Sequence, residues 1–199
     1  MAFDPNQLPA DLPVPADDGA AAHLAGTAMP PVALPATGGG TMRADVVPGG
    51  FTRLVIYAYP MTGLPGVPVP DGWDEIPGAR GCTPETWGFR DHAAGLAAHG
   101  AAVAGLSTQG TGYQQEAADR LRLPFPLLSD AGLTLTRALR LPTFGIDLPP
   151  AYEGGGPRTL LKRLTLVVRG GAIEKVFYPV FPPGQHADEV LAWASTERS

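Results

Sequence analysis

Hydrophobic residues along the chain fall into short continuous runs, which polar and glycine-rich stretches separate. Residues 54–59 read Leu-Val-Ile-Tyr-Ala-Tyr, and residues 102–107 read Ala-Val-Ala-Gly-Leu-Ser. Runs of this length, rich in β-branched and aromatic residues, predict strands that are buried on both faces. A shorter strand is predicted at 125–128, where the sequence reads Phe-Pro-Leu-Leu.

A helical pattern follows the loop that ends at Gly81 and Cys82. Thr83 is predicted as the N-cap, with Pro84 in the first helical position, and Gly100 marks the end of the helix. Between these limits the apolar residues recur at helical spacing, at Phe89, Ala93, Leu96 and Ala97. Further helices are predicted at 112–121, 131–140 and 189–194.

The last two strands are predicted at 164–168 and 172–178. Gly170 and Gly171 separate them, so we expect a hairpin that turns at these glycines. Strands that alternate with helices and end in a hairpin predict an α/β fold, in which helices cover both faces of one sheet.

Proline and glycine concentrate outside these elements. Residues 1–50 are rich in Pro, Ala and Gly and are expected to form a mobile or surface-draped arm. Within it, a hairpin is predicted at about 32–47, turning at the three glycines 38–40. The stretches 61–81 and 142–159 each hold several prolines and are predicted as long loops. Such loops in a compact domain are usually functional lids or inserts.

The composition limits the possible partners and compartments. A chain of 199 residues with 44% hydrophobic residues can form one domain with a real core, and its net charge of −5 argues against nucleic-acid binding. A single cysteine cannot form an internal disulfide, so a cytoplasmic location is expected. No apolar run approaches the roughly 18 residues that span a bilayer, and the N-terminus lacks a signal-peptide pattern. We therefore expect no membrane partner.

The single cysteine, Cys82, is the main candidate for chemistry. It lies next to the start of a predicted helix, where the positive end of the helix dipole and unpaired N–H groups favour a thiolate over a thiol. The alternative is that Cys82 is a small buried hydrophobic residue.

The histidines give no support for a metal site. They are scattered and none has a second ligand at metal-binding spacing, so neither a metal nor a cofactor is expected; they are His23, His92, His99 and His186. A cysteine-dependent hydrolase stays open as an alternative, and it would require a histidine beside Cys82.

Five motifs occur in the same order as in a known family. They are Tyr59-Pro60, then Gly-Cys-Thr-Pro-Glu at 81–85 with Phe-Arg-Asp at 89–91, then Gly-Leu-Ser at 105–107, Phe-Pro-Leu-Leu-Ser-Asp at 125–130 and Arg-Leu-Thr-Leu-Val at 163–167. With these motifs the chain resembles the peroxiredoxins, in the bacterioferritin-comigratory or Q-type branch. The resemblance covers roughly residues 27–195.

This resemblance implies a thioredoxin-like fold with a central mixed β-sheet and an N-terminal extension. The domain would occupy 27–199, after a Pro/Ala-rich arm at 1–26. By resemblance, Cys82 attacks hydrogen peroxide or an organic hydroperoxide and becomes a sulfenic acid, and Arg163 stabilises the thiolate and binds the peroxide. Pro60 and Gly81 would contribute to the substrate site, and no metal is implied.

The chain departs from the family pattern at two places. A long insertion separates Pro60 from Cys82, and Ala79 stands where the family has a threonine, so Thr62 is the candidate for the catalytic hydroxyl. Trp87 occupies the position of the resolving cysteine, which implies a one-cysteine enzyme recycled by an external thiol, either a thioredoxin-like protein or a small thiol. A monomer is expected, with a homodimer as the alternative.

Two alternatives remain open after these departures. The chain could be a thioredoxin-fold redox-sensing or binding protein that lacks fast peroxidase activity. Three aromatic residues could line an apolar collar around the thiol or serve as ordinary packing; they are Trp87, Phe144 and Tyr152.

Overall fold

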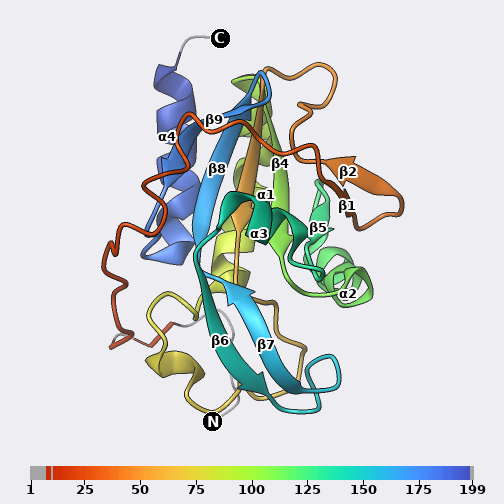
Figure 1. The fold of residues 1–199 in the computed structure, drawn as a ribbon, viewed down its shortest axis with the longest axis vertical. Helices are drawn as coiled ribbons and strands as arrows, with labels where there is room; N and C mark the ends of the chain where they lie inside the picture. The colour runs from red at the N-terminus through yellow and green to blue at the C-terminus, as the bar shows by residue number, and fades with distance from the viewer. Residues whose placement is uncertain (1–7, 10, 198–199) are drawn as a thin grey trace.

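A five-stranded mixed sheet forms the centre of the protein, in the strand order β5-β4-β3-β8-β9 (Figure 1). The computed structural model describes residues 8–9 and 11–197. Strand β3 pairs in parallel with β4 and antiparallel with β8, so the sheet is mixed as expected. The strands are β3 (Arg53–Ala58), β4 (Ala101–Ser107), β5 (Leu127–Ser129), β8 (Leu164–Arg169) and β9 (Ala172–Phe177). All five strands predicted for this sheet are confirmed, and each predicted end lies within two residues of the observed end.

Helices cover both faces of the sheet because successive residues of its strands point to opposite faces. Val55 and Tyr57 of β3 pack in the cluster that also holds residues of α1, α2 and α4, whereas Leu54 and Ile56 pack in the cluster that holds α3. Figure 1 shows α3 in front of the sheet and α4 on the opposite side. The helices are α1 (Cys82–Ala98), α2 (Thr111–Leu121), α3 (Thr134–Leu139) and α4 (His186–Thr196), with short 3-10 helices η1 (Trp73–Glu75) and η2 (Pro183–Gln185).

The N-terminal segment crosses the α3 face of the sheet. Leu24 is fully buried in that core, and the N–H of Gly26 donates to the carbonyl of Ile173 in β9. The hairpin predicted at about 32–47 is confirmed: β1 (Ala33–Pro35) pairs antiparallel with β2 (Thr41–Arg43). The proposed boundary between an arm and a domain at residue 26 stays a prediction.

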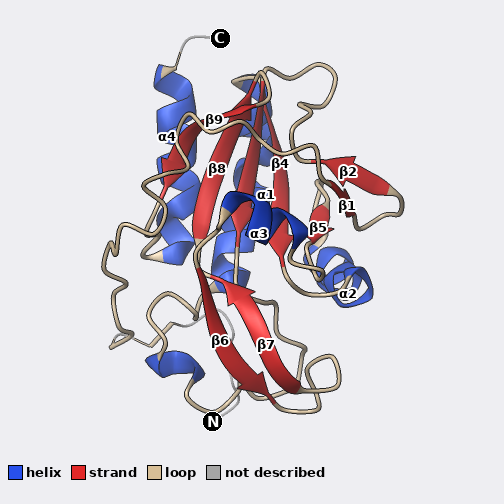
Figure 2. Cartoon of the chain, in the orientation of Figure 1, coloured by secondary structure: helices blue, strands red, loops and turns tan. Residues whose placement is uncertain are grey.

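The prediction of a loop at 142–159 is wrong. Two strands, β6 (Thr143–Leu148) and β7 (Gly156–Leu161), form an antiparallel hairpin that extends below the sheet in Figure 2. The prolines and glycines that suggested a loop are concentrated in the turn at 149–155, and Pro157 is tolerated because a two-stranded hairpin has outer edges. Leu148 and Leu160 pack against the segment 61–81, and this tertiary packing stabilises a hairpin that would be marginal alone.

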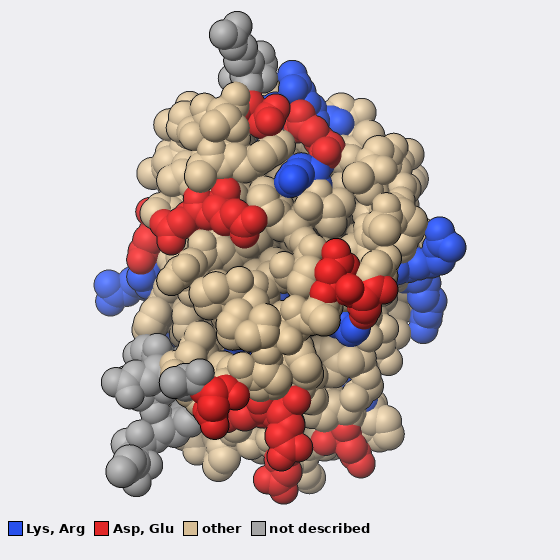
Figure 3. Space-filling model, turned by 90° about the vertical axis from the view of Figure 1, so that its left-hand side faces the viewer, with Lys and Arg blue, Asp and Glu red and all other residues tan. Residues whose placement is uncertain are grey.

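The surface of the protein reflects its acidic composition. On the face drawn in Figure 3, Asp and Glu side chains form the larger charged patches, and Lys and Arg side chains lie mostly at the margins. Within residues 8–9 and 11–197, no helix combines the length and the apolar character needed to cross a membrane.

Candidate active site

Cys82 is the first residue of α1, so the cap predicted at Thr83 is wrong. The N-cap is Gly81, whose φ of 109° lies in the left-handed region that glycine adopts most easily. A Cβ at this position would also collide with the ring of Pro183, so both backbone conformation and packing require glycine. This geometry places the Cys82 sulfur on the first turn of the helix, where N–H groups lack partners within the helix.

Arg163 and Cys82 are brought together by the fold. Arg163 directly precedes β8 and is only 3% exposed. Its Nη2 donates a hydrogen bond to the Cys82 Sγ at 3.3 Å. The same guanidinium donates from Nε to the carbonyl of Gly78 at 3.3 Å and from Nη2 to that of Ala79 at 3.3 Å. A rigid charged fork therefore holds the chain just before Cys82 and contacts the sulfur itself.

Glu85 completes this cluster, and the sequence analysis did not single it out. It is fully buried on the first turn of α1 and forms an ion pair with Nη1 of Arg163. Burial raises the pKa of Glu85 to about 7, with Arg163 acting in the opposite direction. Burial by itself would lower the pKa of Arg163. The interactions of the guanidinium with Glu85 and Cys82 raise this pKa by more, so it is raised overall. The sequence did hold a signal for Glu85. It lies three residues after Cys82, and residues three apart on a helix share one face.

Glu85 contributes stability that is lost as the pH rises from about 4.5 to about 7, whereas His186, whose pKa is lowered to about 3, contributes stability that is gained as the pH rises to about 6.5. In this window the folded state retains a proton on Glu85 that the unfolded chain releases, since the pKa is 4.5 ordinarily and about 7 after folding. The part of the free energy of unfolding that depends on Glu85 should fall by on the order of 3 kcal/mol across the window. Urea unfolding of wild type and Glu85→Gln at the two ends of the window measures this fall as the difference between the two proteins.

Glu85→Gln removes the ionisable group, so its stability should lack this fall and should rise with pH relative to that of wild type. Glu75→Gln serves as the control, because Glu75 is an exposed carboxyl of η1. An equally steep profile in Glu85→Gln would show that the pH dependence comes from other groups.

The other predicted site residues lie in different surroundings. Gly81 lines the cavity in front of the sulfur, but Pro60 and Thr62 do not belong to its described lining, although both are buried. The Thr62 hydroxyl donates to Oε1 of Gln109 at 3.2 Å, and the Thr62 N–H donates to the same oxygen at 2.7 Å. Among the described residues, Thr62 therefore has its hydrogen bonds with Gln109 and none with Cys82.

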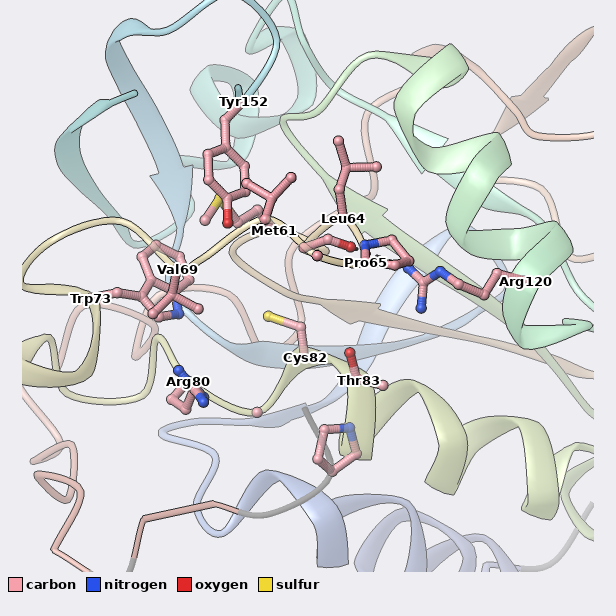
Figure 4. A pocket seen from close by; sticks show the side chains of 15 residues that line it. Met61, Leu64, Pro65, Val69, Trp73, Arg80, Cys82, Thr83, Arg120 and Tyr152 are labelled. Carbon is pink, nitrogen blue, oxygen red and sulfur yellow. Dashed lines mark hydrogen bonds between the residues drawn. The ribbon is translucent and has the colours of Figure 1, made fainter. Parts of the chain in front are cut away.

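A cavity of about 310 Å³ opens in front of the Cys82 sulfur, which points into it (Figure 4). Its wall includes Met61, Val69 and Trp73 from the segment 61–81, together with Tyr152 from the turn between β6 and β7. Tyr152 is the one of the three aromatic collar candidates that lines this cavity. The other two candidates pack elsewhere. The ring centres of Phe144 and Trp73 are 6.2 Å apart, and the Trp87 ring lies beneath the Arg90 guanidinium.

The structure gives no support for a cysteine–histidine pair. Among the described residues, the Cys82 sulfur accepts a hydrogen bond from Arg163 and donates one to the carbonyl of Ala79. His186 is buried and bonds to the hydroxyl of Thr165 at 2.8 Å. Burial and, to a lesser degree, Arg163 lower the pKa of His186 to about 3, which keeps the ring neutral. Residues 8–9 and 11–197 hold no group of three side chains suited to a metal ion.

Comparison with known proteins supports the resemblance seen in the motifs. The family model described as Redoxin matches residues 24–191. Peroxiredoxin Q, chloroplastic, from Gentiana triflora is 30% identical over 141 residues, which cover 69% of this chain and 52% of the relative. The protein of the same name from Arabidopsis thaliana is 30% identical over 138 residues, which cover 69% and 52%. The chain thus spans about half the length of these curated relatives.

Solved structures show the same fold. Peroxidoxin BcpB from Mycobacterium tuberculosis is 27% identical and superposes with a TM-score of 0.66, over 89% of this chain and 100% of the other. Peroxiredoxin Q from Xanthomonas campestris superposes with a TM-score of 0.62 at 22% identity, over 94% and 97%. These similarities confirm the expected thioredoxin-like fold of the peroxiredoxins.

Proposed function

Because the chain belongs to the Redoxin family, as a Q-type peroxiredoxin with one cysteine, we propose that it is a thiol-dependent peroxidase. The observation that carries this proposal is the contact of 3.3 Å between the Arg163 guanidinium and the Cys82 sulfur. No observation favours the alternative of a redox-sensing or binding protein without fast peroxidase activity.

The reaction begins with attack of the Cys82 thiolate on one oxygen of the peroxide. A sulfur–oxygen bond forms and the oxygen–oxygen bond breaks, which oxidises the sulfur to a sulfenic acid and reduces the peroxide. The leaving oxygen departs with the bonding electron pair and takes up a proton, giving water from hydrogen peroxide or an alcohol from an organic hydroperoxide. Both kinds of peroxide are included in the proposal.

Thiolate formation alone cannot make this reaction fast. A thiol whose pKa falls from about 8.5 to about 6 gains roughly 30-fold in thiolate at neutral pH. Its intrinsic nucleophilicity falls about 13-fold for a Brønsted slope of about 0.45, which leaves a net gain of only about twofold. The site must therefore also stabilise the charge that develops on the leaving oxygen.

Arg163 supplies that stabilisation in the proposed mechanism. Its guanidinium is always charged and already sits beside the sulfur, so its N–H donors can hold the peroxide oxygens while charge builds on the leaving one. The N–H of Cys82, on the first turn of α1, is a second donor for this oxygen. The catalytic role predicted for Thr62 stays a prediction, as does a substrate contact by Pro60.

The chain has no second cysteine, so an external thiol must reduce the sulfenic acid. We expect one equivalent of hydrogen peroxide to add one oxygen to the protein, at Cys82, as measured by intact mass and peptide mass spectrometry. The product should persist until a thiol is added, and excess peroxide should drive it to sulfinic and sulfonic acids because no internal disulfide protects it. A disulfide-linked dimer as the main oxidised product would contradict this recycling scheme.

The reductant, the oligomeric state and the cellular location of the protein remain proposals. A thioredoxin-like protein or a small thiol would complete the cycle. The monomeric state expected from the sequence stays a prediction, with the homodimer as its alternative. The cytoplasmic location also stays a prediction, since curated relatives carry the word chloroplastic in their names.

A further inference from the structure

The segment 61–81 is the part of this chain that departs from the compact loop of its family. It folds over the Cys82 sulfur instead of extending into solvent. Met61, Trp73 and Ala79 are buried in one hydrophobic cluster with Leu148 and Tyr152 of the β6–β7 hairpin. The insertion and the hairpin, both expected from the sequence to be loops, thus form a small core of their own beside the thiol.

This small core is tied to the rest of the protein along its length. At its start, the Gln109 side chain donates to the carbonyl of Thr62 and accepts from the Thr62 N–H. The carbonyl of Gly63 accepts from Arg120 at 3.1 Å. In its middle, the Tyr152 hydroxyl donates to the carbonyl of Pro68 at 2.7 Å. These bonds hold the wall of the cavity in place, so the cavity is preformed.

The cavity in front of the sulfur is lined mainly by apolar groups. Figure 4 shows Met61, Leu64, Val69 and Trp73 around the Cys82 sulfur, with Tyr152 above Met61 in this view. The two cationic side chains of the wall lie at its sides, and each is paired with a carboxylate. Arg80 forms an ion pair with Asp74 at 2.8 Å, and Arg120 forms one with Glu116 at 2.7 Å. The lining therefore suits an uncharged ligand.

The cavity is much larger than hydrogen peroxide requires. Its volume is about 310 Å³. A water molecule accounts for roughly 30 Å³ of liquid, so the cavity could hold on the order of ten waters against a largely apolar wall. An apolar group that displaces weakly bonded waters gains affinity.

We propose, on the basis of the peroxidase function proposed above, that this cavity is a subsite for the uncharged organic group of a hydroperoxide. The group it fits is compact, such as a branched alkyl or a single aromatic ring. The organic group would lie among Val69, Trp73 and Tyr152, with the peroxide oxygens toward Cys82 and Arg163. The insertion thereby determines the specificity of a reaction that Cys82 and Arg163 perform.

The first test compares hydroperoxides of increasing apolar size. Each additional buried methylene is worth up to about fourfold in binding. We therefore expect kcat/KM to rise by about tenfold or more from tert-butyl to cumene hydroperoxide, measured with a small-thiol reductant. Equal values of kcat/KM for the two organic hydroperoxides would overturn the subsite.

The second test narrows the cavity. Val69→Phe adds volume at a half-buried position of the wall, and it should lower kcat/KM for cumene hydroperoxide about tenfold more than kcat/KM for hydrogen peroxide. Val46→Phe is the matched control, since Val46 is 48% exposed after β2 and lies outside the cavity. An equal loss with both peroxides in Val69→Phe would overturn the proposal.

The third test measures binding without reaction. Calorimetry with Cys82→Ser should detect 2-phenyl-2-propanol, the alcohol that corresponds to cumene hydroperoxide, and the affinity should fall when Val69→Phe is added. If the wild-type protein reacts with hydrogen peroxide but Cys82→Ser does not bind the alcohol, the subsite proposal is overturned and the proposed function stands. Failure of every peroxide to react would overturn the proposed function.

Discussion

Replacing Cys82 with serine is expected to abolish peroxide reduction. A serine hydroxyl is not ionised at neutral pH and is a far weaker nucleophile than a thiolate, so the attacking group is lost. Stopped-flow measurement of hydrogen peroxide consumption by wild type and Cys82→Ser tests this directly. The substitution is nearly isosteric at a buried position, so the thermal unfolding midpoint should change little. Continued turnover by Cys82→Ser would remove the proposed mechanism.

Replacing Arg163 with lysine is expected to lower the rate of peroxide reduction about 10²-fold, as removal of one oxyanion donor does in other enzymes. Lysine keeps the positive charge but loses the planar fork, which in this structure contacts Sγ of Cys82 and the carbonyl of Ala79 at once. Stopped-flow kinetics of wild type and Arg163→Lys over the same series of peroxide concentrations gives the change in kcat/KM. Arg169→Lys, at the exposed far end of β8, is the matched control and should retain the wild-type rate.

A second variant separates catalysis by Arg163 from its structural role. Arg163→Ala leaves Glu85 without its buried partner, and breaking such a pair costs about 3–5 kcal/mol. Arg163→Ala/Glu85→Gln removes the stranded charge and should recover part of the unfolding free energy without recovering the rate. Recovery of the rate in this double variant would mean that Arg163 acts only by holding the fold.

The strands of the sheet were predictable because their signal is local. The run 54–59 is buried on both faces, and its continuous apolar sequence reflects this directly. The hairpin at 143–161 was missed for the opposite reason. Its strands contain Gly145 and Pro157, and their stability comes from packing on the insertion, about 80 residues away in the chain.

The start of α1 illustrates how packing overrides a local rule. Thr83 and Pro84 fit the usual preferences for the N-cap and the first helical position, which predict a helix that begins after Cys82. The helix begins at Cys82 instead, because Gly81 adopts a positive φ and packs against Pro183. This shift of two residues places the sulfur on the helix itself, within reach of Arg163.

The sequence by itself determined the order of the central-sheet strands and the main helices, the thioredoxin-like architecture and the candidate pair Cys82 and Arg163. These follow from short-range periodicity and from motifs, which are written in neighbouring residues. Only the tertiary structure decided that Glu85 pairs with Arg163, that Thr62 bonds to Gln109, and that the insertion walls an apolar cavity. The physical reason is that these contacts join segments tens of residues apart. Their formation depends on how the layers pack, and local pattern carries no information about that packing.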